Sequence, residues 1–425
     1  MTSKTRALTS SVHAIYWALL TAAAVQLTAA SVRAETNTLK IYLLAGQSNM
    51  VGQAYTWDNF ATINNWNVPS LDYLTNNTAY FNSLPNDVFT FKETFAADWL
   101  TTPRNDAWAV HYDSENGQTL QVRATRDLFP GDNSQPNYPT GIQPLSVGFG
   151  LDAGIGVASE GTNITPSLIG AELSMGHLLG DVLKSPIFLF KSAQGGTTLA
   201  EDWRPPSAVA ARGGSVGADY TNTINQFKSF LDDLDADLAD NGVLDDYNNA
   251  VGYEVAGFVW LQGFNEVVEN GGAFIPEYAD NLVDLVNDIR DSDSRIGDDL
   301  PAIIVESSDQ DSDLNMQRIA AASRLDAANA GSAVFIETNG LKDVNYGGLN
   351  SAGEIFSDNF GFHFHARPEN FLQIGALIGD SILDNGFTGS ESIPEPCSGL
   401  LLISGGLFLL VELRSRDRTT PETPN

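Results

Sequence analysis

The chain has 425 residues, of which 53 are acidic and 22 are lysine or arginine, so its formal net charge is −31. This balance argues against a nucleic-acid-binding protein, because phosphate backbones are bound by basic faces, and against electrostatic docking on anionic lipid. The single cysteine, Cys397, excludes an intrachain disulfide and a thiolate-rich zinc site, and five histidines leave little room for a histidine-rich metal site.

The first 34 residues have the pattern of a secretory signal peptide. Lys4 and Arg6 precede an apolar stretch over residues 14–25, and the small residues Val32 and Ala34 stand at positions −3 and −1 of a cleavage site. An uncleaved N-terminal membrane anchor is the alternative. We expect a cleaved signal peptide over residues 1–34.

From residue 35 to residue 390, the pattern predicts one domain of alternating strands and helices. Short apolar runs, typical of strands buried on both faces, are Thr38–Ala45, Pro186–Lys191, Val255–Leu261, Pro301–Glu306 and Ala333–Glu337. Apolar residues at helical spacing predict helices over Leu168–Leu183, Tyr220–Leu238, Tyr278–Ile289, Met316–Ala328 and Phe371–Ile382. This alternation indicates an α/β fold with a mostly parallel sheet and helices on both of its faces.

Two stretches do not follow the alternation. Residues 52–165 are rich in Asn, Thr, Gly, Pro and aromatic residues with weak periodicity, so we expect long insertions on the site face, in which short strands can occur, with His111 in an irregular segment. The acidic stretch Asp232–Asp246 lacks the glycine that an EF-hand loop requires. A solvated helix end is the preferred interpretation of that stretch, and a calcium site is the alternative.

In parallel sheets, functional sites form at the carboxyl ends of the strands, so the loops after the first three predicted strands are the candidates. Ser48 follows the first strand, Gly195 and Gly196 follow the second, and Asn265 follows the third. A serine hydroxyl can attack a carbonyl, and backbone amides with an asparagine side chain can bind the resulting oxyanion. Taken singly, Ser48 could be a helix N-cap and the other residues ordinary turn residues.

A serine nucleophile needs a base, and His363 and His365 are the candidates, because they stand just before the last predicted helix. If that segment is extended, alternation puts both rings on one side. His13 leaves with the signal peptide, and His177 falls inside a predicted helix, where a structural role is preferred.

Four blocks in this order resemble those of SGNH hydrolases, and more closely the sialate O-acetylesterase-like branch, carbohydrate esterase family six. The blocks are Gly46–Met50 (GQSNM), Lys191–Ser207 (KSAQGGTTLAEDWRPPS), Gly257–Glu266 (GFVWLQGFNE), and the ending from Gly361 to Gly375. Gly170–Asp181 is also similar, and the resemblance extends over most of residues 38–384. It implies a three-layer α/β/α sandwich with about five parallel strands, and deacetylation of O-acetylated sugars without a metal or another cofactor.

The resemblance implies Ser48 as the nucleophile and His363 as the general base. The oxyanion hole would combine the amides of Ser48 and of Gly195 or Gly196 with the Asn265 side chain. Further supporting positions are Gln47, Gln262, Glu266 and His365.

Two departures concern the acid of the triad. The third block usually ends in Asn-Asp, and here Glu266 replaces the aspartate. The acid usually stands three residues before the histidine, where this chain has Phe360. Asp358 or Glu266 could take its place, or the site could work as a dyad.

The expected function is therefore that of a secreted or cell-surface serine esterase acting on O-acetylated carbohydrate, of sialate O-acetylesterase or acetylxylan esterase type. The missing acid leaves a non-catalytic glycan-binding protein on the same fold as one alternative, and a lipid or simple-ester hydrolase is another. The sequence does not name the sugar.

Residues 391–425 resemble a PEP-CTERM sorting tail. Ile393-Pro394-Glu395-Pro396 precedes an apolar stretch over residues 397–413, and three arginines follow it. The stretch is short for a bilayer span, although the basic residues after it fit the positive-inside rule. The resemblance implies export, membrane contact through this segment alone, and processing by exosortase-like sorting machinery; a plain C-terminal anchor is the alternative.

Overall fold

The computed structural model describes residues 37–56, 60–63, 66–114, 118–119, 142–150, 168–309, 311–338, 341, 348–349, 355–356 and 361–389. The predicted signal peptide and the predicted sorting tail lie outside these ranges. No helix within them is long and apolar enough to cross a membrane.

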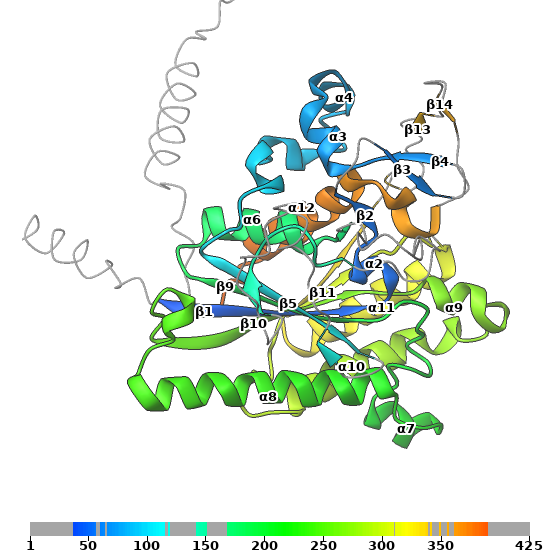
Figure 1. The fold of residues 1–425 in the computed structure, drawn as a ribbon. Coiled ribbons are helices and arrows are strands. Elements are labelled where there is room, and N and C mark those ends of the chain that lie inside the picture. Colours follow the sequence, from blue (N-terminus) through cyan, green and yellow to red (C-terminus); the bar gives the residue numbers. More distant parts are fainter. Residues whose placement is uncertain are drawn as a thin grey trace, which may run out of the picture.

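A mostly parallel sheet forms the centre of the fold (Figure 1). Its strand order is β12-β11-β10-β1-β9-β5-β6, and β7 pairs with β5 off this path. The six strands from β12 to β5 are parallel to their neighbours, and β6 and β7 pair with β5 in antiparallel fashion. The bounds are β1 Thr38–Gly46, β5 Ala107–Asp113, β6 Gln118–Thr119, β7 Gln143–Pro144, β9 Ile187–Ala193, β10 Gly252–Leu261, β11 Ala302–Val305 and β12 Ala333–Ile336.

Helices cover both faces of this sheet, because its central strands are apolar on both sides. Along β1, Tyr42 and Leu44 belong to one buried apolar cluster, and Ile41 and Leu43 belong to the other. The helices α6 (Glu172–Val182) and α12 (Pro368–Asp384) pack on each other over the first face. The second face carries α8 (Ala218–Asn241), α10 (Tyr278–Asp291) and α11 (Ser312–Ala328), and Figure 1 shows α8 opposite α6 and α12. The predicted three-layer α/β fold is therefore confirmed.

All five predicted strands are present in the sheet, and all five predicted helices begin within four residues of the expected position. The helix predicted to begin at Leu168 differs in its first residues. Leu168–Ile169 is instead the short strand β8, which pairs with β2 (Ala54–Tyr55), and α6 begins only at Glu172. Gly170 separates the two elements, and a side chain there would lie within 3.0 Å of the Gly52 backbone.

The interpretation of residues 52–165 as insertions on the site face, with short strands allowed among them, was wrong in one respect. β5 lies within them and belongs to the main sheet, where it pairs with β9. His111 is on this strand and is buried, so it does not lie in an irregular segment. The apolar run Ala107–Val110 is only four residues long before His111, which is too short to give a clear periodicity.

Short elements complete the described fold. The helices are α2 Ser48–Val51, α3 Leu71–Asn76, α4 Thr78–Ser83, α7 Pro206–Arg212 and α9 Phe264–Val268; the strands are β3 Phe60–Ile63, β4 Trp66–Pro69, β13 Gly348–Leu349 and β14 Ile355–Phe356; and the 3-10 turns are η1 Thr90–Glu93, η2 Ala97–Leu100, η3 Asp245–Tyr247, η4 Glu269–Gly272, η5 Ile275–Glu277 and η6 Gly361–Ala366. The acidic stretch Asp232–Asp246 forms the end of α8 and the turn after it, where Asp232 and Asp235 form ion pairs with Arg295.

Candidate active site

Three of the loops singled out from the sequence leave the sheet at the same level. In the register of the central strands, Gly46 is paired with Ala193 on one side and with Leu261 on the other. Leu261 is in turn paired with Val305. The segments that begin at residues 47, 194, 262 and 306 therefore start side by side at the carboxyl edge of the sheet, where parallel folds build their sites.

Ser48 is the first residue of α2, directly after the tight turn that ends β1. Gly46 has φ +150°, and a Cβ there would lie 2.2 Å from the carbonyl oxygen of Leu261, so only glycine fits this turn. The Gln47 amide donates to that same carbonyl at 3.3 Å. Ser48 is 6 % exposed, which places its side chain just below the surface at the sheet edge.

The glycine pair after β9 lies beside Asn265. Gly196 has φ +78°, and the nearest heavy atom to a Cβ placed on it is Nδ2 of Asn265, 4.0 Å away. Asn265 is the second residue of α9, which follows β10. The structure thus brings a backbone segment with a glycine and a side-chain amide together, as an oxyanion-binding site requires.

The Asn265 amide group is held at both ends. Its Oδ1 accepts a hydrogen bond from Nε2 of Gln47 at 3.3 Å, and its Nδ2 donates to Oε1 of Glu269 at 2.9 Å. Oε1 of Gln47 also accepts from the backbone amides of Gly263 at 3.1 Å and Asn265 at 3.4 Å. These contacts fix which way the amide points and leave one N–H of Nδ2 for another acceptor. Gln47 was predicted as a supporting residue, whereas Glu269 was missed.

Glu266 braces the loop that carries the glycine pair. It is fully buried, and its carboxylate accepts hydrogen bonds from the backbone amides of Leu199 and Ala200 and from Nε2 of Gln262. Gln262 donates in addition to the carbonyl of Thr197 at 3.0 Å. Burial raises the pKa of Glu266 to about 8, and the hydrogen bonds it accepts offset part of this rise. Oε1 accepts both loop amides, and Oε2 accepts from Gln262, which itself donates to the loop, so the described contacts of Glu266 are those of a loop brace.

A buried ion pair supports the other end of α2. Nζ of Lys191 lies 3.0 Å from Oε2 of Glu172 and donates to the carbonyl of Val51, the last residue of α2, at 2.8 Å. Both side chains are 1 % exposed. The pair therefore ties the helix that begins with Ser48 to β9 and α6.

We expect Lys191→Met to lower the free energy of unfolding by about 3–5 kcal/mol, because it leaves the Glu172 carboxylate buried without its cation. Lys40→Met is the matched control. Lys40 is equally buried on β1, but its partner Glu254 is 33 % exposed and can be solvated. Urea unfolding followed by tryptophan fluorescence would measure both losses, and equal losses would contradict this account.

His363 lies in the turn η6, next to α2, the helix that begins with Ser48. The segment Gly361–Ala366 contacts α2 and precedes α12. His363 is 6 % exposed, and burial lowers its pKa to about 4, so its imidazole is neutral at pH 7 and able to accept a proton. Asp358 and Phe360, which bear on the acid of the triad, lie outside the described residues.

The histidine segment is not extended, so the expectation that alternation puts both rings on one side does not apply. Phe364, His365 and Ala366 have φ of 48°, 61° and 54°. Left-handed backbone costs about 1–2 kcal/mol per non-glycine residue. Nδ2 of Asn370 holds the turn through a hydrogen bond to the Phe364 carbonyl at 2.8 Å. Such strain is typical of functional segments.

The other two described histidines are structural. Nδ1 of His111 lies 2.9 Å from the carbonyl of Phe149, and the ring of His177 stacks on Trp99 with centroids 4.0 Å apart. Burial lowers the pKa of both. The structural role preferred for His177 agrees with this stacking.

Comparison with known proteins gives one family and several distant structures. The family model described as "Carbohydrate esterase, sialic acid-specific acetylesterase" matches residues 161–354. This range contains the glycine pair and Asn265 but neither Ser48 nor His363, so it is narrower than the resemblance seen in the motifs. No curated protein matches the sequence.

Three solved structures are similar at low identity. A protein from Arabidopsis thaliana has 16 % identity and a TM-score of 0.42, covering 81 % of this chain and 98 % of its own. A carbohydrate acetylesterase from Xanthomonas citri has 12 % identity and a TM-score of 0.38, and the match covers 83 % of this chain and 57 % of that one. NanS has 11 % identity and a TM-score of 0.38, and the match covers 82 % of this chain and 97 % of NanS.

Proposed function

We propose that the chain is a serine esterase that removes acetyl groups from O-acetylated carbohydrate. The observation that carries the proposal is the sheet register, which starts the Ser48, Gly195–Gly196 and Asn265 loops side by side. The match of residues 161–354 to a carbohydrate esterase model supports the same reaction class.

In the proposed reaction, Oγ of Ser48 attacks the acetyl carbonyl carbon while His363 takes the hydroxyl proton. The carbonyl oxygen becomes an oxyanion, which the amides of Ser48 and of Gly195 or Gly196 and Nδ2 of Asn265 stabilise. The carbon–oxygen bond to the sugar then breaks, and His363 returns the proton to the sugar hydroxyl. Water attacks the acetyl-enzyme by the same route, and acetate leaves. Asp358 would orient the histidine in this scheme.

The test of this function is acetate release by the full chain from acetylated xylan and from O-acetyl sialic acid, together with mass spectrometry after treatment with a fluorophosphonate. We expect release from at least one substrate and a phosphonyl group on Ser48. Release without labelling of Ser48 would contradict the serine mechanism. No release from either substrate or from a simple acetyl ester would instead favour a glycan-binding protein.

We expect Glu269→Ala to lower kcat for acetyl ester hydrolysis about 10-fold, because the Asn265 amide loses the acceptor that orients it. Glu269→Gln keeps an oxygen at that place and should retain most of the activity. The control is Asp280→Ala, which removes an exposed partner of Arg324 and should leave kcat within about twofold. Equal kcat in Glu269→Ala and Asp280→Ala would show that Glu269 does not orient Asn265.

Export and attachment at the cell surface are part of the proposal. They depend on the signal-peptide pattern of residues 1–34 and on the sorting-tail pattern of residues 391–425. Immunoblotting of secreted and membrane fractions, with and without residues 391–425, would test both.

A further inference from the structure

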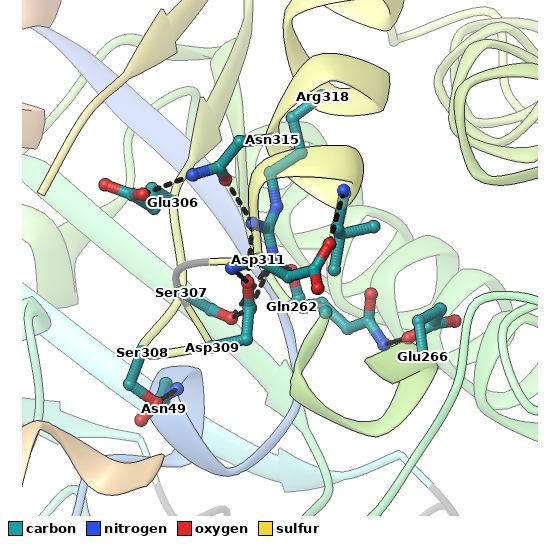
Figure 2. A network of polar contacts seen from close by, with 12 residues as sticks. Asn49, Gln262, Glu266, Glu306, Ser307, Ser308, Asp309, Asp311, Asn315 and Arg318 are labelled. Carbon is teal, nitrogen blue, oxygen red and sulfur yellow. Dashed lines mark hydrogen bonds and ion pairs between the residues drawn. The ribbon is translucent and has the colours of Figure 1, made fainter. Parts of the chain in front are cut away.

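A second buried ion pair, between Asp309 and Arg318, lies next to the segment that follows β10 and carries Asn265. Nη2 of Arg318 is 2.7 Å from Oδ2 of Asp309, and Nη1 is 3.1 Å from Oδ1, so the contact is bidentate. Both side chains are 0 % exposed. Asp309 follows β11, and Arg318 lies on α11 (Figure 2).

Arg318 also reaches the end of β10. Its Nη2 donates to the carbonyl of Gln262 at 2.9 Å and to Oγ of Ser307 at 3.1 Å. Gly263 has φ +146°, and a Cβ there would lie 1.9 Å from Nη2. The guanidinium therefore sits directly against the peptide that precedes Asn265, and only glycine allows this approach.

The same β11 segment touches the other half of the site. Oγ of Ser308 accepts a hydrogen bond at 2.9 Å from Nδ2 of Asn49, the residue after Ser48. Figure 2 shows Asn49 of α2 and Gln262, the residue after β10, lying next to the segment Ser307–Asp309. One rigid unit thus contacts both the nucleophile helix and the loop that carries Asn265.

A buried ion pair adds little net stability, because the cost of desolvating two charges offsets their attraction. A planar guanidinium with fixed donors does supply defined geometry. We propose that Asp309 and Arg318 are positioning residues, which fix the Gln262–Gly263 peptide and thereby the direction of the Asn265 amide during acyl transfer. This inference rests on the proposed function.

The test compares Arg318→Ala with Arg290→Ala in the full chain, using 4-nitrophenyl acetate as the substrate. Arg290 is a matched control because it is also buried and donates to backbone carbonyls, those of Leu300 and Ser332, at the opposite edge of the sheet. We expect Arg318→Ala to lower kcat about 100-fold with a much smaller change in KM, since misplacement by about 1 Å has an effect of this size. Arg290→Ala should keep kcat within about threefold.

Added guanidinium chloride at low concentration should partly restore kcat of Arg318→Ala and leave Arg290→Ala unchanged. Arg318→Lys should not restore it, because an ammonium group cannot hold Asp309 and the Gln262 carbonyl with one planar fork. Loss of activity in both alanine variants in proportion to their unfolded fraction would overturn the proposal.

Two further measurements keep the outcomes separate. If Arg318→Ala does not fold, Asp309→Asn and Ser308→Ala take its place, with a fall in kcat at unchanged folded fraction as the expected result. Amide hydrogen exchange should show faster exchange at Gly263 and Asn265 in the Arg318 or Asp309 variant than in Arg290→Ala, and equal exchange would overturn the positioning role even without any turnover. Full activity of a Ser48 variant would instead refute the proposed function.

Discussion

Replacing Ser48 by alanine is expected to lower kcat for acetate release by about 10⁴-fold or more, with the protein still folded. Without the hydroxyl, no acetyl-enzyme can form, and only binding and the oxyanion donors remain to assist attack by water. Ser48 is the first residue of a four-residue helix whose position is fixed by Gly46 and by Lys191, so the substitution leaves the supporting contacts in place.

The control for this substitution is Ser174→Ala. Ser174 is buried on α6 and donates to the carbonyl of Leu372 on α12 at 2.7 Å, so its hydrogen bond joins two helices and involves none of the loops after β1, β9 and β10. Its loss should cost about 1 kcal/mol in unfolding free energy and leave kcat unchanged. Acetate assays and urea unfolding of both variants separate the two effects. Full activity in Ser48→Ala would refute the serine mechanism.

The fold was largely predictable because its central strands are buried on both faces. Runs such as Thr38–Ala45 and Val255–Leu261 have almost no polar residues, and this composition occurs in few structures other than a parallel sheet. β5 was missed because its apolar run, Ala107–Val110, is only four residues long and a histidine follows it. Its place in the sheet is set by pairing with β9, and the local sequence pattern carries no information about that pairing.

The candidate site was predictable to a different degree. Ser48, Gly196 and Asn265 stand immediately after strands, so their convergence follows from topology and strand ends alone. Glu269 and Arg318 carried no signal in the sequence. The contact of Arg318 with Gln262 joins residues 56 positions apart and depends on how α11 packs beside β10. Gln47 was expected as a supporting residue from its motif, whereas the contacts of Glu269 and Arg318 are found only once the fold is known.

The conformation of the turn that carries His363 and His365 could not be predicted from the sequence either. Alternation was the natural expectation for a segment that reads Phe-His-Phe-His, but three consecutive residues adopt positive φ. Tertiary contacts, among them the bond from Asn370 to the Phe364 carbonyl, select this backbone over an extended one. A turn of this kind places His363 beside α2, the helix that begins with Ser48, while Phe364 stays fully buried.

We expect His363→Ala to lower kcat by about 10³-fold, the usual contribution of a positioned general base. His365→Ala is the matched comparison, because it lies two residues away in the same strained turn. If His365→Ala loses more activity than His363→Ala, the role of the base passes to His365, which the sequence left open. Circular dichroism of both variants would show whether the turn and α12 remain folded.

The pH dependence gives an independent check on His363. A base must be neutral to accept the serine proton, so kcat/KM rises with pH through the pKa of that group in the free enzyme and is flat above it. Because burial lowers the pKa of His363 to about 4, the acid limb should have its midpoint near pH 4. An exposed histidine would place it near 6.5. A midpoint near 6.5 in the full chain would mean that the base has another environment, whereas a midpoint near 4 that disappears with His363→Ala would assign the proton transfer to this buried imidazole.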